Sequence, residues 1–166
     1  MNNCRDIVNI LLKLLPVSSL FSIKRTLIRM MGVNVGEGVS INGHSWFYGR
    51  GKISIGDNTW LGVGCKFYSV AGHFIDIGRN CDIAPEVTFV PGTHKMGTSE
   101  RRAGEGYALD IKVGDGCWIG TSVTILGGVT IGSGVMIAAG AVVAKDIPDN
   151  CLAAGIPAVP KKFFND

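Results

Sequence analysis

The chain has 166 residues, which suffices for one domain of ordinary size but not for two, and 46% of its residues are hydrophobic. Lys and Arg exceed Asp and Glu only by 16 to 13 and form no dense basic run, so the composition argues against nucleic acid as a partner. Glycine is abundant, at 24 residues, yet the hydrophobic fraction is too high for a disordered linker. Glycine is therefore expected at regularly spaced turns.

The five cysteines are far apart, odd in number and without a CxxC pair. This spacing argues against both a disulfide framework and a zinc ribbon. It is typical of a reducing compartment, so we expect the protein to be cytoplasmic, either free or peripheral to the inner face of the membrane.

The first predicted element is a helix over residues 5–15, which is apolar on most of its surface and is ended by Pro16. It is too short and too interrupted to span a bilayer. A second helix follows, whose basic residues Lys24, Arg25 and Arg29 are expected to face water. We interpret residues 1–32 as a helical cap over the open end of a repeat structure. A basic, apolar helix lying on a membrane surface is an alternative compatible with the cap.

From residue 33 the sequence pattern changes, because a large aliphatic residue or Phe returns at every sixth position. Short insertions after Phe47 and Phe67 and a long one after Phe89 interrupt the series, which then runs unbroken from Val113 to Val143. Neither a helix nor a simple strand has a period of six, so the pattern indicates an internal repeat. The positions expected to point inward are Val35, Ile41, Phe47, Ile55, Leu61, Phe67, Ile77, Ile83, Phe89, Val113, Ile119, Ile125, Ile131, Ile137 and Val143.

Three such hexads make one triangular turn, with the aliphatic side chain inside each flat face and Gly, Asn or Asp at each corner. The predicted fold is mainly β: a parallel β-helix of about five triangular coils, roughly 24 Å tall at the spacing of adjacent strands. Cys65, Cys81 and Cys117 each lie four residues after an inward aliphatic residue. We therefore predict that these thiols are buried packing groups.

The long interruption covers residues 90–112 and is predicted to be an extruded loop, charged and rich in glycine. Loops held on a stiff scaffold are where binding and catalytic groups concentrate. His94 opens this loop, whereas His44 occupies a corner of the first coil and His73 lies in one of the short insertions. Because His is naturally poised for proton transfer near neutral pH, His94 is the strongest of the three candidates.

Four motifs carry a resemblance to a known family. They are GTH at Gly92 to His94, VGDGCWIGTSVTILGGVTIG ending at Gly132, AAGAVVAKDIPDN, and AAGIPAVPKK ending at Lys162. Together with the hexads they resemble the hexapeptide-repeat acyltransferases, whose β-helix is left-handed. The branch is similar to the galactoside, maltose and xenobiotic acetyltransferases and to the sugar O-acetyltransferases of capsule and lipopolysaccharide assembly. The resemblance implies that residues 33–166 are a left-handed β-helix acetyltransferase domain with a C-terminal tail.

The resemblance also implies a set of roles. His94 would be the general base, acetyl-CoA the co-substrate without any metal, and the active sites would lie between the subunits of a homotrimer. A departure is Val159, where relatives often carry Lys or Arg, which puts one phosphate contact in doubt. The implied coenzyme A contacts are Trp118, Thr121, Ala139, Ala144, Lys145, Lys161 and Lys162.

The activity expected from the resemblance is acetyl transfer from acetyl-CoA to a hydroxyl of a sugar, in the biosynthesis of cell-surface polysaccharide. Direct transfer is favoured, because an acyl-cysteine intermediate needs an accessible thiol. One alternative is an N-acetyltransferase of an amino-sugar nucleotide, which would need the same base. Another, from a different class, is a non-catalytic β-helix that serves as an assembly platform.

Two further assignments stay open. A carboxylate that orients the imidazole is expected by analogy with catalytic triads, and Asp76, Glu86 and Asp110 are all candidates. Arg101 and Arg102 in the long insertion are candidates for contacts with the acceptor, or they are simply solvated.

Overall fold

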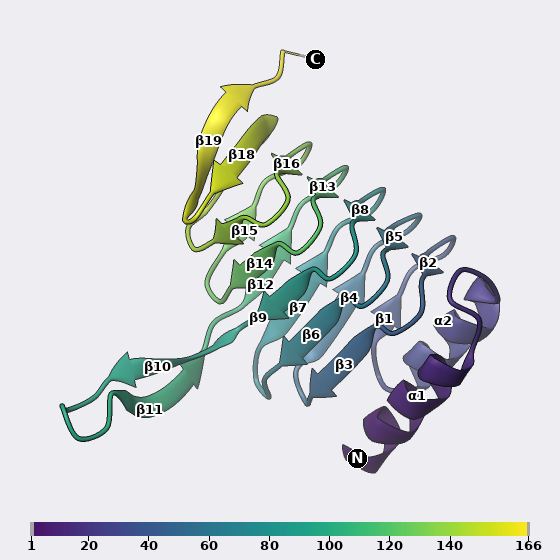
Figure 1. The fold of residues 1–166 in the computed structure, drawn as a ribbon. Coiled ribbons are helices and arrows are strands. Elements are labelled where there is room, and N and C mark those ends of the chain that lie inside the picture. Colours follow the sequence, from purple (N-terminus) through teal and green to yellow (C-terminus); the bar gives the residue numbers. More distant parts are fainter. Residues whose placement is uncertain (1, 166) are drawn as a thin grey trace.

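A computed structural model describes residues 2–165 of the chain. Two helices, α1 (Asn2–Leu14) and α2 (Phe21–Met30), cover one end of a three-faced prism of short parallel strands (Figure 1). None of the helices in this range has the length and apolar character needed to cross a membrane. The repeat thus folds as predicted, into stacked triangular coils.

Each face of the prism is one sheet, and the chain visits the three faces in turn. Face A contains β1 (Asn34–Val35), β4 (Lys52–Ile55), β7 (Phe74–Ile77), β12 (Ile111–Val113) and β15 (Thr130–Ile131). Face B contains β2 (Ser40–Ile41), β5 (Trp60–Leu61), β8 (Asp82–Ile83), β13 (Trp118–Ile119) and β16 (Met136–Ile137), and ends in the antiparallel pair β18 (Cys151–Gly155) and β19 (Ala158–Phe163). Face C contains β3 (Trp46–Gly49), β6 (Lys66–Ser69), β9 (Thr88–Val90), β14 (Thr124–Leu126) and β17 (Val142–Val143).

The core is the stack of inward side chains that the period of six predicts. Every position expected to point inward is at most 4% exposed. On face C the rings of Phe47, Phe67 and Phe89 lie one above another, with centroids 4.8 Å apart at both steps. Because strand pairing aligns identical positions of successive coils, one hydrophobic stripe runs through the whole prism.

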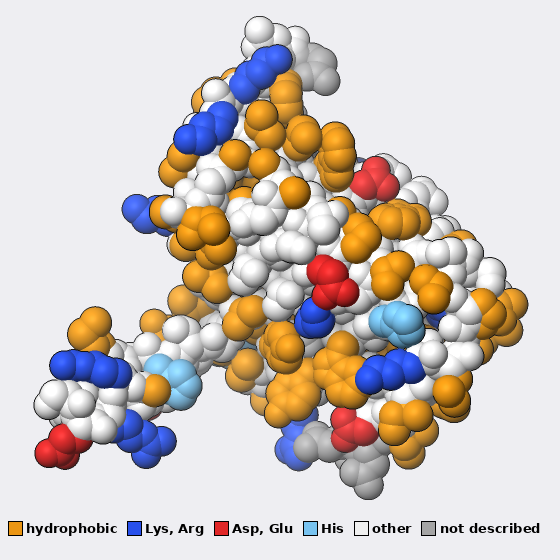
Figure 2. Space-filling view, viewed as in Figure 1, with side chains coloured by type: hydrophobic (Ala, Val, Ile, Leu, Met, Phe, Trp, Pro, Cys, Tyr) orange, Lys and Arg blue, Asp and Glu red, His pale blue; other side chains and the backbone are white. Residues whose placement is uncertain are grey.

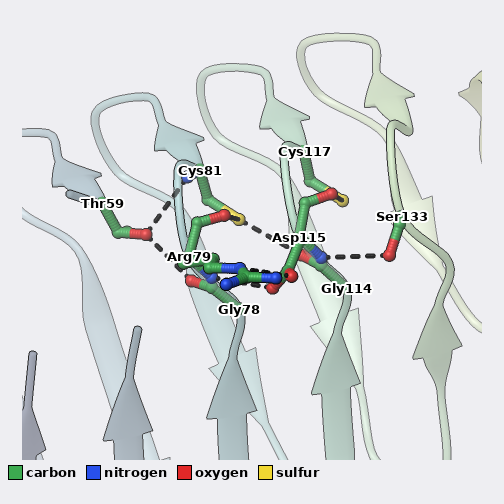
Figure 3. A network of polar contacts seen from close by, with 8 residues as sticks. All are labelled: Thr59, Gly78, Arg79, Cys81, Gly114, Asp115, Cys117 and Ser133. Atoms are coloured by element: carbon green, nitrogen blue, oxygen red, sulfur yellow. Dashed lines mark hydrogen bonds and ion pairs between the residues drawn. The ribbon is translucent and has the colours of Figure 1, made fainter. Parts of the chain in front are cut away.

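Polar contacts hold successive coils together where the chain passes from face A to face B (Figure 3). Arg79 Nε donates to Asp115 Oδ2 at 2.9 Å, and the backbone N–H of Arg79 donates to the other carboxylate oxygen at 3.0 Å. These hydrogen bonds, the backbone one above all, hold the pKa of Asp115 below its usual value. The network lies at this edge and involves no residue of the long insertion, so we assign it a structural role.

All three interruptions of the repeat fall at a different edge, where the chain passes from face C to face A, which we call the C–A edge. The inward residues flanking this edge are 8 residues apart in the first coil (Phe47, Ile55), 10 in the second (Phe67, Ile77) and 24 in the third (Phe89, Val113), instead of six. The third interruption forms a two-stranded antiparallel hairpin, β10 (Gly92–Met96) with β11 (Ala103–Ala108). The predicted extrusion is therefore confirmed, but it is built of paired strands.

The helical cap contradicts one expectation, because Lys24 is fully buried instead of facing water. Its Nζ donates to the carbonyl of Val17 at 2.7 Å and lies over the ring of Phe21. Val8 and Leu12 of α1 and Ile28 of α2 join the core of the prism. The buried lysine thus fixes the linker between the two helices.

Candidate active site

The hairpin of β10 and β11 projects from the C–A edge into solvent, well clear of the three faces (Figure 1). Figure 2 shows charged side chains gathered near its tip. Lys95 and Glu105 pair across its two strands at 2.6 Å, and Arg102 donates to the carbonyl of Gly97 within it. Arg101 is also exposed. In a single chain these groups are at the surface, so the hairpin by itself offers no enclosed site.

His94 lies on β10 near the root of the hairpin and is exposed. Its Nδ1 is 2.9 Å from the carbonyl oxygen of Gly104. A carbonyl can only accept a hydrogen bond, so Nδ1 carries the proton in the neutral ring and Nε2 keeps its lone pair. The hairpin thus holds an imidazole in the tautomer that a general base requires.

Glycines of the opposite strand make room for this arrangement. Gly106 pairs with His94 in the hairpin register, and a Cβ at Gly106 would lie 3.5 Å from the imidazole Cε1. A Cβ at Gly104 would come within 2.9 Å of the carbonyl oxygen of Lys95. The hydrogen-bond partner of His94 is a backbone carbonyl, which cannot be identified from the residue type. The glycines of the insertion are the signal in the sequence that relates to it.

None of the three candidate carboxylates contacts His94 within the described chain. Asp110 Oδ1 instead lies 3.1 Å from His73 Nδ1 and accepts the backbone N–H of Phe74, while Glu86 pairs with Lys66 on a different edge. Asp76 is an exposed residue of face A. The carbonyl of Gly104 therefore takes the place that we expected for a carboxylate. Within residues 2–165 no three His, Cys, Asp or Glu side chains are grouped as metal ligands.

The contact between His73 and Asp110 ties the root of the hairpin to the preceding coil. Asp110 lies between β11 and β12, directly before β12, and its carbonyl accepts the backbone N–H of Gly128 in the next coil at 2.9 Å. On the other strand, the carbonyl of Pro91 accepts the backbone N–H of Leu109 at 3.0 Å. The root is thus fixed from both neighbouring coils, which sets the direction in which His94 is presented.

We expect His73→Ala to lower kcat by roughly tenfold to a hundredfold, since small misplacements of a catalytic group are costly. Hydrogen exchange of the amides in β10 and β11 should become faster in this variant, while exchange in β13 to β17 stays unchanged. His44→Ala, at an exposed corner of the first coil, is the matched control. Unchanged turnover and unchanged exchange in the hairpin would show that the tie is dispensable.

Part of the predicted coenzyme A contacts lie together on face B and its edge. Strand register places Trp118, Met136, Leu152 and Lys162 in one row across the sheet. Three strand spacings separate the exposed Trp118 from the exposed Lys162, or roughly 14 Å. Thr121 and Ala139 occupy equivalent positions of adjacent coils where face B turns into face C. Lys161, next to Lys162 on β19, is also exposed.

Ala144 and Lys145 lie elsewhere, because they follow β17 and therefore sit on the C–A edge. Both are exposed. They share this edge with the hairpin, two coils further along the prism, whereas Trp118, Thr121, Ala139 and Lys162 are on face B or its junction with face C. A single chain thus separates the predicted contacts into two groups, one of which lies on the same edge as His94.

The cysteines do not compete with His94 for a catalytic role. Cys65, Cys81, Cys117 and Cys151 are buried, as predicted for the first three, and only Cys4 is exposed. Burial raises the pKa of Cys65 to about 12. A hydrogen bond with the Cys117 thiol lowers the pKa of Cys81 to about 7, yet Cys81 is only 1% exposed and cannot meet a substrate. Direct transfer is consistent with these positions.

Thiol labelling should reflect this burial. We expect one thiol per native chain, Cys4, to react rapidly with Ellman's reagent, and all five to react after unfolding in denaturant. Cys4→Ser should abolish the rapid phase. Rapid labelling of Cys81 or Cys117 in the native protein would contradict the buried arrangement.

Comparison with known proteins agrees with this architecture. Residues 110–145 match the family model described as bacterial transferase hexapeptide (six repeats), and residues 52–84 match the hexapeptide repeat of succinyl-transferase. Galactoside O-acetyltransferase of Escherichia coli (strain K12) is 36% identical over 143 residues, which are 86% of this chain and 70% of that protein. A putative colanic acid biosynthesis acetyltransferase of the same strain is 29% identical over 133 residues, 80% of this chain and 70% of its own length.

Among solved structures, a hexapeptide-repeat acetyltransferase from Vibrio cholerae O1 biovar eltor, complexed with acetyl coenzyme A, superposes with a TM-score of 0.83. It is 27% identical, and the match covers 99% of this chain and 87% of that one. The likeness confirms the expected left-handed β-helix. Several curated relatives are longer, since the chain spans 70%, 55%, 53% and 55% of four of them. The repeat, the fold and the extent of these matches show that the protein belongs to the hexapeptide-repeat acetyltransferase family and is an acyltransferase.

Proposed function

We propose that the protein transfers an acetyl group from acetyl-CoA to a hydroxyl of a sugar, with His94 as general base. The observation that carries the proposal is the 2.9 Å contact between His94 Nδ1 and the carbonyl oxygen of Gly104, which in the neutral ring leaves Nε2 to accept a proton. The relatives named above are acetyltransferases, one of them with acetyl coenzyme A bound. Family membership also favours an enzyme over an assembly platform.

The chemistry follows from the tautomer. Acetyl-CoA supplies an activated thioester carbonyl, and a sugar hydroxyl is too weak a nucleophile to attack it unless its proton is removed. His94 Nε2 takes that proton, and the hydrogen bond from Nδ1 to Gly104 stabilises the imidazolium that forms. The imidazolium then returns the proton to the leaving thiolate. The acetyl group moves in one step between the two substrates, without an acyl-enzyme.

We further propose that acetyl-CoA contacts Trp118, Thr121, Ala139, Ala144, Lys145, Lys161 and Lys162. Their division between face B with its junction to face C and the C–A edge supports sites shared by two copies, in which one chain contributes the hairpin edge and its neighbour contributes face B. Such contacts between two different surfaces close into a ring, and we propose a ring of three chains, a homotrimer with three such sites. In that trimer, face B of the neighbouring chain would cover the hairpin, which a single chain leaves in solvent.

Binding of coenzyme A is the first test. We expect saturating coenzyme A to raise Tm, because a ligand at a hundred times its Kd stabilises the native state by about 2.7 kcal/mol. Lys161→Gln with Lys162→Gln should weaken this effect, and the exposed Lys95→Gln in the hairpin should leave it intact. A melting curve that coenzyme A does not shift, together with absent transfer from acetyl-CoA to any sugar, would reject the proposed function.

The acceptor is proposed to belong to a cell-surface polysaccharide or to its precursor, which the similarity to the putative colanic acid biosynthesis acetyltransferase supports. The competing candidate is an amino-sugar nucleotide acetylated at nitrogen. The two differ in the stability of the product, since an O-acetyl ester is removed by mild base and an amide is not. Mass spectrometry of the product before and after mild alkali therefore distinguishes them.

We also infer that the helical cap contacts a membrane surface. α1 is apolar on two sides: Val8 and Leu12 pack into the core, while Ile7, Ile10, Leu11 and Leu14 are exposed at the spacing of one helical face. Replacing Ile7, Ile10 and Leu14 together by Ser should reduce sedimentation with phosphatidylglycerol vesicles and leave sugar acetylation in solution unchanged. Equal sedimentation of both forms would reject the inference, and a change of oligomeric state would assign the face to another copy.

A further inference from the structure

A cavity of about 360 Å³ lies at the C–A edge, between α1 and the first two coils. Its walls include Arg5 and Asp6 of α1, Tyr48 and Arg50 of the first coil, and Ser69 and Val70 of the second. Arg5 is only 9% exposed, so a charged side chain forms part of a buried wall. The contacts of Arg5 indicate which kind of ligand fits the cavity.

Arg5 is fixed by neutral groups alone among the described residues. Nη1 donates to the carbonyl of Gly49 at 2.6 Å and to Ser69 Oγ at 2.8 Å, and Nη2 donates to the carbonyl of Gly51 at 3.1 Å. Nε lies 3.4 Å from the carbonyl of Met31. A guanidinium stays charged inside proteins, and these acceptors engage four of its five N–H groups without neutralising it. Within the described chain, the second N–H of Nη2 is left to donate to a ligand.

Arg29 offers a contrast within the same cap. It too binds the prism through a backbone carbonyl, that of Val35, but it also pairs with the carboxylate of Glu37 at 2.8 Å. No corresponding ion pair is found for Arg5 in residues 2–165. The cavity wall therefore carries a rigid, buried positive charge on Arg5.

The cavity adjoins the root of the catalytic hairpin. Val70 lines the cavity, and its Cγ2 lies 3.5 Å from the position that a Cβ would take on Gly92, the first residue of β10. His94 is two residues further along that strand. A molecule that fills the cavity thus lies on the side of the hairpin that faces α1, next to the root from which His94 projects.

Two aromatic rings add a surface suited to a sugar. Tyr48 lines the cavity and is 58% exposed, and Tyr68 lies beside it one coil further, with ring centroids 6.1 Å apart and planes tilted by 58°. Exposed aromatic faces of this kind pack against the apolar face of a pyranose ring. Charge and aromatic surface therefore occur together beside the hairpin.

We propose that this cavity is the acceptor subsite and that it selects an anionic sugar, whose carboxylate or phosphate is bound by Arg5 while its ring rests on Tyr48. The proposal rests on the proposed function, because it names the class of sugar that receives the acetyl group. An anion in the cavity supplies the counter-charge that the protein does not give Arg5, and it gains a charge-assisted hydrogen bond from a donor that is already fixed in place.

The first experiment compares acceptors with the unmodified protein. A methyl hexoside, the hexose 1-phosphate and the methyl hexuronoside of the same sugar are assayed with acetyl-CoA, in the glucose and the galactose series. At least one anionic acceptor should exceed the neutral one in kcat/KM by about tenfold or more, a typical effect of one hydrogen bond to a charged group. The two anionic arms show whether phosphate or carboxylate is preferred. Equal values for all three acceptors would overturn the proposal.

Variants then locate the effect. Arg5→Gln should abolish the preference for the anionic acceptor, and Arg29→Gln, a cap arginine outside the cavity, should retain it. Tyr48→Ala should lower kcat/KM for charged and neutral acceptors alike. Because Arg5 also clamps α1 to the prism, circular dichroism and Tm are recorded for each variant, and Arg5→Lys is prepared as a second form that keeps the charge. A preference that persists in folded Arg5→Gln would contradict the assignment.

A binding measurement separates this proposal from the proposed function. The side-chain Nε–H resonance of Arg5, assigned by its loss in Arg5→Lys, is followed by NMR while glucose 1-phosphate, methyl glucuronoside or methyl glucoside is added at constant ionic strength. It should move with at least one of the two anions and not with the neutral sugar. An unmoved resonance overturns the anionic subsite even if coenzyme A binds. A resonance that moves while coenzyme A fails to bind rejects the acetyltransferase assignment alone.

Discussion

His94→Ala should lower kcat by about 10² to 10⁴, with little change in the Kd of coenzyme A. The imidazole is the group that the hairpin presents with a free Nε2, and no other described His of this chain lies on the hairpin. Alanine removes the base but leaves β10 and its pairing with β11 in place. The rate is measured with acetyl-CoA and the best acceptor found, and Kd by titration calorimetry.

Two controls separate loss of the base from damage to the hairpin. His44→Ala removes an exposed imidazole at a corner of the first coil and should leave kcat unchanged. His94→Gln keeps the size and a hydrogen-bonding group but cannot accept the proton at a ring nitrogen, so its rate should stay close to that of His94→Ala. A variant at His94 with more than a tenth of the original kcat would exclude its role as general base.

Substitutions that disturb the orientation of the imidazole should lower kcat by less than removal of the imidazole does. Gly104 accepts from Nδ1 through its backbone, so no side-chain substitution removes the hydrogen bond directly. Gly104→Ala instead forces the chain apart, because the new Cβ would lie 2.9 Å from the carbonyl oxygen of Lys95. Gly106→Ala places its methyl in ordinary contact with the imidazole, at 3.5 Å from Cε1. A larger loss of kcat in Gly104→Ala than in Gly106→Ala is the order that the geometry implies.

The repeat could be predicted from the sequence because it depends on a local rule. An aliphatic side chain at every sixth residue can be buried only if three hexads close into one coil, and the strand register then brings Val35, Ile55, Ile77 and Val113 into one column. The same rule located the extrusion before Val113, since residues 90–112 cannot continue it. His94 was singled out by its place at the start of this extrusion.

What the sequence could not reveal depends on contacts between distant segments. Arg5 reaches Gly49 and Ser69, which are 44 and 64 residues away, and nothing in the pattern of α1 distinguishes it from a solvated arginine. Lys24 was expected in water for the same reason and is buried against Val17. The partner of His94 is a backbone carbonyl, fixed by the register of the hairpin. In each case most of the partners of the polar group are backbone carbonyls, which every residue type carries and which the sequence therefore does not reveal.

The C–A edge brings together the groups to which we assign a function. Its turns lengthen from the first coil to the third, and the cavity, the His73 to Asp110 contact and the hairpin occur there in that order. A solenoid tolerates such insertions because each coil contacts only its neighbours, so extra residues at one corner leave the other two faces intact. Faces A, B and C supply rigidity, and the C–A edge carries the groups that we assign to acceptor binding and proton transfer.

Phe67→Ala should be the most damaging single change in the core, lowering the free energy of unfolding by about 3 to 5 kcal/mol. Phe67 is the middle ring of three, fully buried, with Phe47 and Phe89 stacked on its two sides at interplanar angles of 1° and 9°. Its loss leaves both neighbours facing a cavity, whereas Phe47→Ala or Phe89→Ala breaks one ring contact each. Urea unfolding followed by circular dichroism, at fixed protein concentration, measures the change.

The matched control is Tyr68→Ala in the same strand, whose side chain points outward and is 39% exposed, and which should cost less than about 1 kcal/mol. Phe67→Leu should fall between the two, because it refills most of the cavity. The functional consequence is local, since Phe89 lies on β9, three residues before the start of β10. A cavity next to Phe89 loosens the coil from which β10 departs, so Phe67→Ala should lower kcat even where the prism remains folded. Equal stability losses for Phe67→Ala and Tyr68→Ala would show that the aromatic stack does not hold these coils together.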